Sequence, residues 1–86
     1  MPHREQEILM LRRELEILMG ERQTLLRVAG SAAVLIASLD SGRLPVSAVE
    51  SADMVATSIN ALTEDTLQDA LDSVRAEIEK EGSAGN

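Results

Sequence analysis

Side chains that could do acid–base or nucleophilic chemistry are few in this sequence. His3 is the only histidine, and it lies at the very start of the chain. A general base must be held at hydrogen-bond distance from its partner, which we do not expect of a residue in a fraying terminus. None of the eight serines lies in a G-x-S-x-G motif, and no second imidazole could activate one. The sequence therefore favours a role other than catalysis.

Cofactor and metal motifs are also missing from the pattern. The segment Gly42-Arg43-Leu44-Pro45 lacks the glycine spacing and the Lys-Ser/Thr end of a phosphate-binding loop. The chain has no cysteine, which excludes disulfides and cysteine-based zinc sites. We expect no bound cofactor and no resident metal.

Four carboxylates form one ridge on a helix expected over residues 64–80. The acidic ridge consists of Asp65, Asp69, Asp72 and Glu79. Its main interpretation is a solvated face that keeps the protein soluble. A docking face for a basic protein surface is the second, and a divalent-metal site is the third, although the spacing lacks the loop of an EF-hand.

Nucleic-acid binding is disfavoured by charge and composition. The arginines of the first half, Arg12, Arg13, Arg22 and Arg27, are interleaved with Glu14, Glu16 and Glu21. Phosphate contacts dominate nucleic-acid affinity, and these glutamates cancel the field that such contacts need. The chain has no Phe, Trp or Tyr on which a base could stack.

Charge separates the chain into two halves. Residues 1–46 hold equal numbers of acidic and basic side chains, so the whole net charge of −7 comes from residues 47–86. No apolar run reaches the roughly 20 residues that cross a bilayer, and the first residues lack the apolar stretch of a signal peptide. We expect a cytoplasmic protein without a membrane-spanning segment.

The dominant pattern is a heptad repeat in the first half. Apolar side chains recur three and four residues apart, which predicts one long helix over about residues 4–40 with a coiled-coil face. The residues assigned to an oligomer interface are Ile8, Leu11, Leu15, Leu18, Arg22 and Leu25. Glu7 and Arg12 flank this face, and Glu7 of one helix would pair with Arg12 of a parallel neighbouring helix. Arg22 would form a polar layer within the face.

A second apolar stripe complicates a simple zipper. Met10 and Ile17 fall outside the heptad face, so the helix is apolar on more than one side. Helices of this kind usually contact two or more neighbours. The pattern therefore indicates a helical bundle, and a helix too long for the rest of the chain to cover predicts self-association.

Glycine and proline divide the remaining sequence. Gly30 is a candidate break in the first helix, and residues 32–39 are apolar nearly all round, which predicts the densest core there. The segment from Asp40 to Pro45 ends the helix. Ser47 and Glu50 match a capping box for a second helix over about residues 48–62.

Thr63 is a candidate N-cap for the third helix, over about residues 64–80. Residues 82–86 read as a disordered tail after a single domain over residues 1–81. The core is expected at Ile36, Leu39, Val55, Ile59, Leu62, Leu67, Leu71, Val74 and Ile78. The fold class is all-α, an oligomeric helical bundle or coiled coil.

Three functions are compatible with this pattern. The leading hypothesis is a homo-oligomeric helical module that binds itself and another protein, as an adaptor, assembly chaperone or regulatory subunit. The alternative is a small acidic inhibitor whose C-terminal helices dock on the basic nucleic-acid-binding surface of a larger protein. A DNA-binding co-regulator is the least favoured.

Overall fold

Over residues 2–84 the chain folds into three α-helices and one short 3-10 turn. The computed structural model describes the backbone of residues 2–84 and the side chains of residues 3–80. Helix α1 spans Pro2–Ser38, η1 spans Ser41–Arg43, α2 spans Val46–Asn60 and α3 spans Glu64–Ala84. Over residues 2–84 there is no β-strand, so the fold class is all-α as the sequence predicts.

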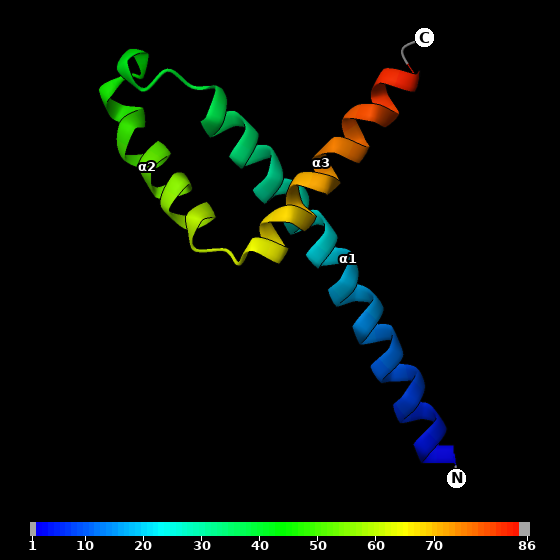
Figure 1. The fold of residues 1–86 in the computed structure, drawn as a ribbon. Coiled ribbons are helices and arrows are strands. Elements are labelled where there is room, and N and C mark those ends of the chain that lie inside the picture. Colours follow the sequence, from blue (N-terminus) through cyan, green and yellow to red (C-terminus); the bar gives the residue numbers. More distant parts are fainter. Residues whose placement is uncertain (1, 85–86) are drawn as a thin grey trace.

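The helices form an open cross rather than a closed bundle. α3 passes over the middle of α1, α2 lies beside the C-terminal half of α1, and the N-terminal half of α1 projects away from both (Figure 1). The radius of gyration is 18.3 Å and the principal extents are 65 × 37 × 23 Å. A compact chain of this length would have a radius of gyration of about 12 Å. The chain therefore leaves much of its apolar surface uncovered.

The best-buried contacts lie where α1 and α3 cross. We call Leu26, Gly30, Ala70 and Val74 the crossing; Ala70 is fully buried and Leu26 is 5% exposed. Each helix contributes two residues spaced four apart, the row that interdigitates in common helix crossings. Because Gly30 and Ala70 carry little or no side chain, the two backbones come close together there.

The close approach explains why Gly30 does not break α1. A Cβ built on Gly30 would lie 2.6 Å from Cγ2 of Val74 and closer still to the carbonyl oxygen of Ala70. The expected break is absent, since α1 runs without interruption through this residue. The glycine makes room for α3 instead of ending the helix.

The segment over residues 32–39 is not the enclosed core that its composition predicts. Ala32, Ala33 and Ile36 are half-buried, whereas Val34 and Leu35 are exposed. α2 covers one side of this segment, and α3 has already crossed α1 nearer the middle (Figure 1). The burial therefore centres on the crossing, one to two turns earlier than expected.

The starts of the two later helices differ in how they are capped. α2 begins after Pro45 with no side-chain cap, and Ser47 lies inside its first turn, so the predicted capping box is wrong. Proline suits this start because it cannot donate a backbone hydrogen bond. At α3, Thr63 Oγ1 accepts a hydrogen bond from the amide of Thr66 at 3.2 Å, as expected of an N-cap.

The end of α3 lies later than its sequence pattern indicates. The helix continues to Ala84, so residues 82–84 are helical rather than part of a disordered tail. A single glycine destabilises a helix by only about 1 kcal/mol relative to alanine, so Gly82 does not end α3. Residues 85 and 86 of the predicted tail lie outside the described residues.

Candidate functional site

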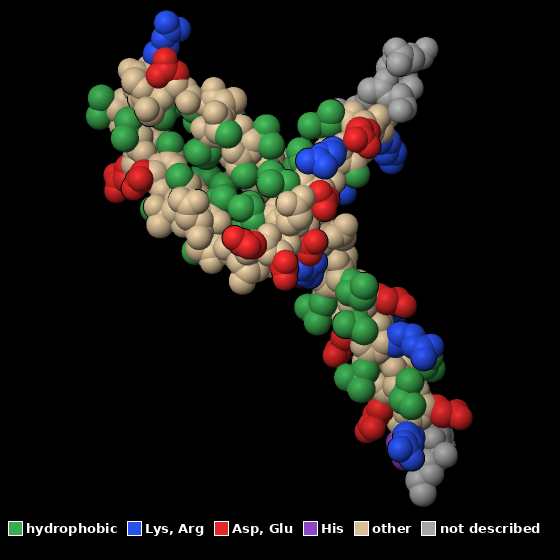
Figure 2. Space-filling view, in the orientation of Figure 1, with side chains coloured by type: hydrophobic (Ala, Val, Ile, Leu, Met, Phe, Trp, Pro, Cys, Tyr) green, Lys and Arg blue, Asp and Glu red, His purple; other side chains and the backbone are tan. Residues whose placement is uncertain are grey.

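The N-terminal part of α1 is a surface that the chain leaves uncovered. We call residues 4–21 the arm, and neither α2 nor α3 reaches it (Figure 1). The heptad residues of the arm, Ile8, Leu11, Leu15 and Leu18, are called the arm stripe and are 50% to 64% exposed. In Figure 2 apolar side chains cover much of the arm between charged ones. Single exposed apolar residues are ordinary, but a contiguous row marks an interaction surface.

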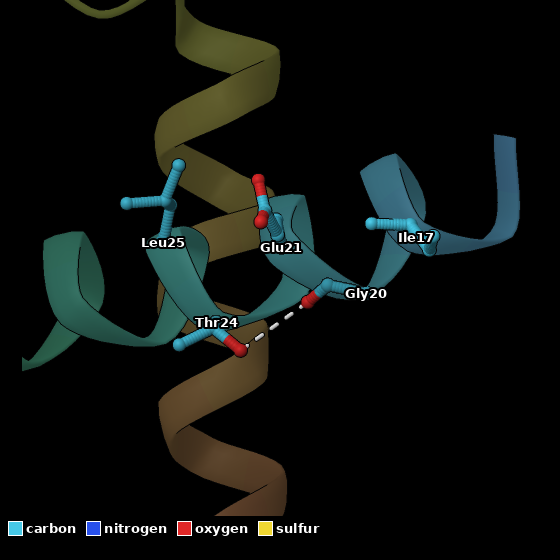
Figure 3. Close-up of a pocket in the computed structure, with 5 residues that line it drawn as sticks. All are labelled: Ile17, Gly20, Glu21, Thr24 and Leu25. Carbon is cyan, nitrogen blue, oxygen red and sulfur yellow. Dashed lines mark hydrogen bonds between the residues drawn. The ribbon is translucent and has the colours of Figure 1, made fainter. Parts of the chain in front are cut away.

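A second apolar surface runs along another side of the arm. Met10 and Ile17 are 61% and 56% exposed, and they are spaced seven residues apart as the sequence indicates. Beyond Ile17 lies a shallow notch lined by Gly20, Glu21, Thr24 and Leu25 (Figure 3). Thr24 Oγ1 donates to the carbonyl oxygen of Gly20, which turns its hydroxyl back onto the helix. The notch is thus mainly apolar and open.

Gly20 has no packing partner among the described residues. A Cβ built on Gly20 would meet nothing within 4 Å, in contrast to Gly30. The two glycines look alike in the sequence, yet only Gly30 is required by the fold of a single chain. This difference lies in tertiary contacts that helical periodicity does not contain.

Charges border the arm stripe unevenly. Glu7, Glu14 and Glu21 follow one edge at seven-residue intervals, and Arg12 lies on the other edge. All four side chains are exposed, and no ion pair joins any of them to another described residue. These charges are available to a helix that lies along the stripe.

The predicted interface residues Arg22 and Leu25 lie just beyond the C-terminal end of the arm and have different roles. The guanidinium of Arg22 is 3.5 Å from a carboxylate oxygen of Asp69 on α3. Leu25 is 66% exposed and borders the notch. Arg22 therefore belongs to the contact between α1 and α3, whereas Leu25 remains uncovered.

A groove between α1 and α2 is a further apolar surface of the molecule. Its lining comes from Val28, Ala29 and Ala32 on α1 and from Met54, Val55, Ser58, Ile59 and Leu62 at the other side. Val28 and Met54 are 60% and 65% exposed at its edges. Apolar side chains gather between these two helices in Figure 2. We call this surface the α1–α2 groove.

The predicted core residues are distributed over the head formed by α2, α3 and the C-terminal half of α1. Val74 is buried in the crossing. Partly buried positions are Ile36, Val55, Ile59, Leu62, Leu67 and Leu71. Leu39 and Ile78 are exposed at 37% and 59%, so neither belongs to the core of the single chain. The C-terminal half of α3, which carries Ile78, diverges from α1 beyond the crossing (Figure 1).

Sequence reasoning missed most of the crossing. Leu26, Gly30 and Ala70 were absent from the expected core, although all three are buried. Leu26 falls outside the heptad face, and small residues carry almost no periodicity signal. The one available signal was the spacing of four between a large and a small residue on both helices.

The acidic ridge is partly engaged within the chain. Asp69 contacts Arg22, and Asp72 accepts a hydrogen bond of 2.9 Å from Nε2 of Gln68. Asp65 and Glu79 are exposed at the two ends of the ridge. Asp69 thus helps to hold α3 on α1, a role different from docking a basic partner.

Chemistry-bearing side chains do not converge on any point of the described structure. His3 is exposed at the start of α1. Within the described part of the chain, no three His, Asp or Glu side chains are placed to hold a metal ion. None of the helices described here combines the length and apolarity needed to cross a membrane.

No family model, curated protein or solved structure matches the chain.

Proposed function

We propose that this chain is a non-enzymatic, homo-oligomeric helical interaction module of the cytoplasm, serving as an adaptor, assembly chaperone or regulatory subunit. The observation that carries the proposal is the arm stripe, whose four large aliphatic side chains are at least half exposed. An isolated helix of this kind gains little from its own propensity, since most helix stability in proteins comes from packing. A partner on the arm would supply that packing.

The remaining surfaces suit a second role for the head. The α1–α2 groove is apolar and lies outside the arm, so it stays accessible when arms associate. Groove-and-helix recognition uses apolar surfaces of this kind. The module would therefore associate through its arm and bind another protein through its head.

The acidic inhibitor has less support. Its docking face depends on the ridge, and the ion pair between Asp69 and Arg22 already uses one of the four carboxylates within the chain. Separately, the arm stripe would have no role in an inhibitor that acts as a monomer.

Sedimentation velocity across micromolar to near-millimolar concentrations tests the proposal. The wild-type chain should form a species of at least twice the monomer mass of 9.3 kDa. Leu11→Lys should shift association to higher concentration by roughly 30-fold or more, because burying the exposed part of each leucine contributes about 1 kcal/mol and the charge adds a further cost.

Leu9→Lys is the matched control. Leu9 lies on the same arm and is 63% exposed, close to the 64% of Leu11, but it is outside the arm stripe. This variant should associate like the wild type. A strictly monomeric wild-type chain at all concentrations, or equal effects of the two substitutions, would overturn the proposal.

A further inference from the structure

The charged residues on either side of the arm stripe indicate how two arms would pair. Residues that flank a coiled-coil face set the orientation of its partner. One edge is a row of glutamates at positions 7, 14 and 21, and the opposite edge carries Glu5 and Arg12. We infer that the occupant of the arm stripe is a second copy of this chain, paired parallel and in register. This inference rests on the proposed function.

Parallel pairing places opposite charges together. In a parallel pair, each residue on the glutamate edge of one copy faces the residue five positions later in the sequence on the opposite edge of the second copy. Glu7 of each copy then lies beside Arg12 of the other, so the contact occurs twice by symmetry. The next residue of that edge is Met19, which places no like charge opposite Glu14.

Antiparallel pairing places like charges together. When two arms overlap fully in opposite directions, each edge faces its own counterpart on the partner. Glu14 then lies beside the second copy's Glu14, Glu7 beside its Glu21, and Arg12 beside its Arg12. A shift by one heptad leaves Glu7 opposite Glu14 of the second copy, although it also brings Glu5 beside its Arg12. The parallel register is the one in which the paired edges make attractive contacts without repulsive ones, so charge favours it.

The structure also indicates where the pairing ends. Arg22 would be the next residue of the stripe, but its guanidinium contacts Asp69 of its own chain. Four residues later Leu26 is buried under α3. The chain's own α3 thus occupies the space beside α1 from this point, and the intermolecular contact is confined to Ile8–Leu18. The contact is short, so association in the micromolar range or weaker is expected.

A parallel pair has a functional consequence. Both heads lie at the same end of the paired arms, because each head follows its arm in the same direction (Figure 1). The dimer would then present two α1–α2 grooves on one side. A partner that carries two apolar helices could bind both grooves, and the second contact would gain from the high local concentration set by the first.

Disulfide trapping tests the orientation. The chain contains no cysteine, so a single introduced thiol can form a protein–protein disulfide only with a second copy. Leu11→Cys should form an interchain disulfide readily in air or a glutathione buffer, because parallel pairing in register places position 11 opposite itself at a separation that a disulfide can span. Arg13→Cys, on the outer side of the arm, is the control and should remain largely reduced.

Charge reversal provides an independent test. Arg12→Glu should raise the dimer dissociation constant about three- to tenfold at low salt, since it turns two favourable contacts into repulsions. Adding Glu7→Arg to the same chain should restore wild-type association. Circular dichroism verifies that each variant keeps its helix content.

The outcomes separate this inference from the proposed function. If the wild-type chain associates but Leu11→Cys stays as reduced as the control, and the double charge reversal fails to restore association, the parallel register is wrong while the module remains. If the wild-type chain is monomeric, both fail. Trapping together with charge rescue supports the parallel pair.

Discussion

Replacement of Gly30 by alanine is the sharpest test of the crossing. Alanine is the best helix former and glycine is worse by about 1 kcal/mol, so α1 considered alone predicts that Gly30→Ala stabilises the protein. The structure predicts the opposite sign. The new methyl group would lie 2.6 Å from Cγ2 of Val74, 2.8 Å from the carbonyl carbon of Ala70 and closer still to its oxygen.

The magnitude follows from which atoms would have to move. A clash with the end of a flexible side chain can be relieved by a rotamer change, but the carbonyl of Ala70 belongs to the backbone of α3. Overpacking costs typically 1–3 kcal/mol, and a backbone clash takes the upper part of this range. After the gain of about 1 kcal/mol in helix propensity, Gly30→Ala should lower the free energy of unfolding by about 1–2 kcal/mol.

Gly20→Ala is the matched control for this prediction. The two glycines lie in the same helix, and a Cβ at Gly20 would meet nothing within 4 Å. Only the propensity term remains, so this variant should leave the free energy of unfolding unchanged or raise it by up to about 1 kcal/mol. The two substitutions are expected to act in opposite directions.

Urea unfolding followed by circular dichroism at a fixed protein concentration measures both variants. A fixed concentration is necessary because association stabilises the folded state. The melting temperature gives a second measurement, with about 4–8 °C expected for each kcal/mol in a domain of this size. Stabilisation by both substitutions would show that α3 does not approach α1 at Gly30, and the description of the crossing would be wrong.

Two further predictions concern the cap of α3 and the ion pair. Thr63→Ala should lower the free energy of unfolding by about 1 kcal/mol, whereas Ser47→Ala, whose hydroxyl caps no helix, should change it by less than about 0.5 kcal/mol in the same urea titration; equal effects would contradict the assignment of the caps. A double-mutant cycle of Arg22→Ala and Asp69→Ala should give a coupling below about 1 kcal/mol that disappears in high salt, because both side chains are more than half exposed. A coupling well above that value, retained in high salt, would refute the exposed geometry.

Much of the secondary structure could be predicted from the sequence, because helical periodicity and turn residues act locally. The three helices follow from apolar spacing, and the stop after Ser38 follows from the glycine and proline of the connecting segment. Thr63 is an N-cap in both the prediction and the structure. The capping box predicted at Ser47 is wrong because α2 begins directly after Pro45. Proline and serine are both typical of helix starts, and the sequence pattern alone does not show which of two neighbouring residues precedes the first helical one.

The arrangement of the helices could not be predicted in the same way. Gly30 and Ala70 have almost no hydrophobic weight, yet they determine where α3 meets α1. Leu39 and Ile78 match apolar stripes but lie away from the crossing. Periodicity identifies which side of a helix is apolar, whereas the position along the helix that meets a neighbour depends on backbone shape and small residues.

The arm stripe lies where the heptad pattern places an apolar face, and its role as an oligomer interface stays a prediction. Its four residues are exposed, as are the other described side chains of the arm, because neither α2 nor α3 covers this part of α1. Sequence reasoning extended this face through Arg22, whereas the ion pair with Asp69 gives Arg22 a contact within its own chain. That contact depends on where α3 lies against α1, and a local heptad repeat does not predict the position of a helix later in the chain.

The uninterrupted course of α1 has a mechanical consequence. One continuous helix carries both the arm and the crossing, so the arm acts as a stiff lever fixed to the head. Each residue along an α-helix turns the direction of its side chains by about 100° and advances the axis by about 1.5 Å. A partner that selects one face of the arm thereby sets the direction in which α2 and α3 point, tens of ångströms from the place where it is bound.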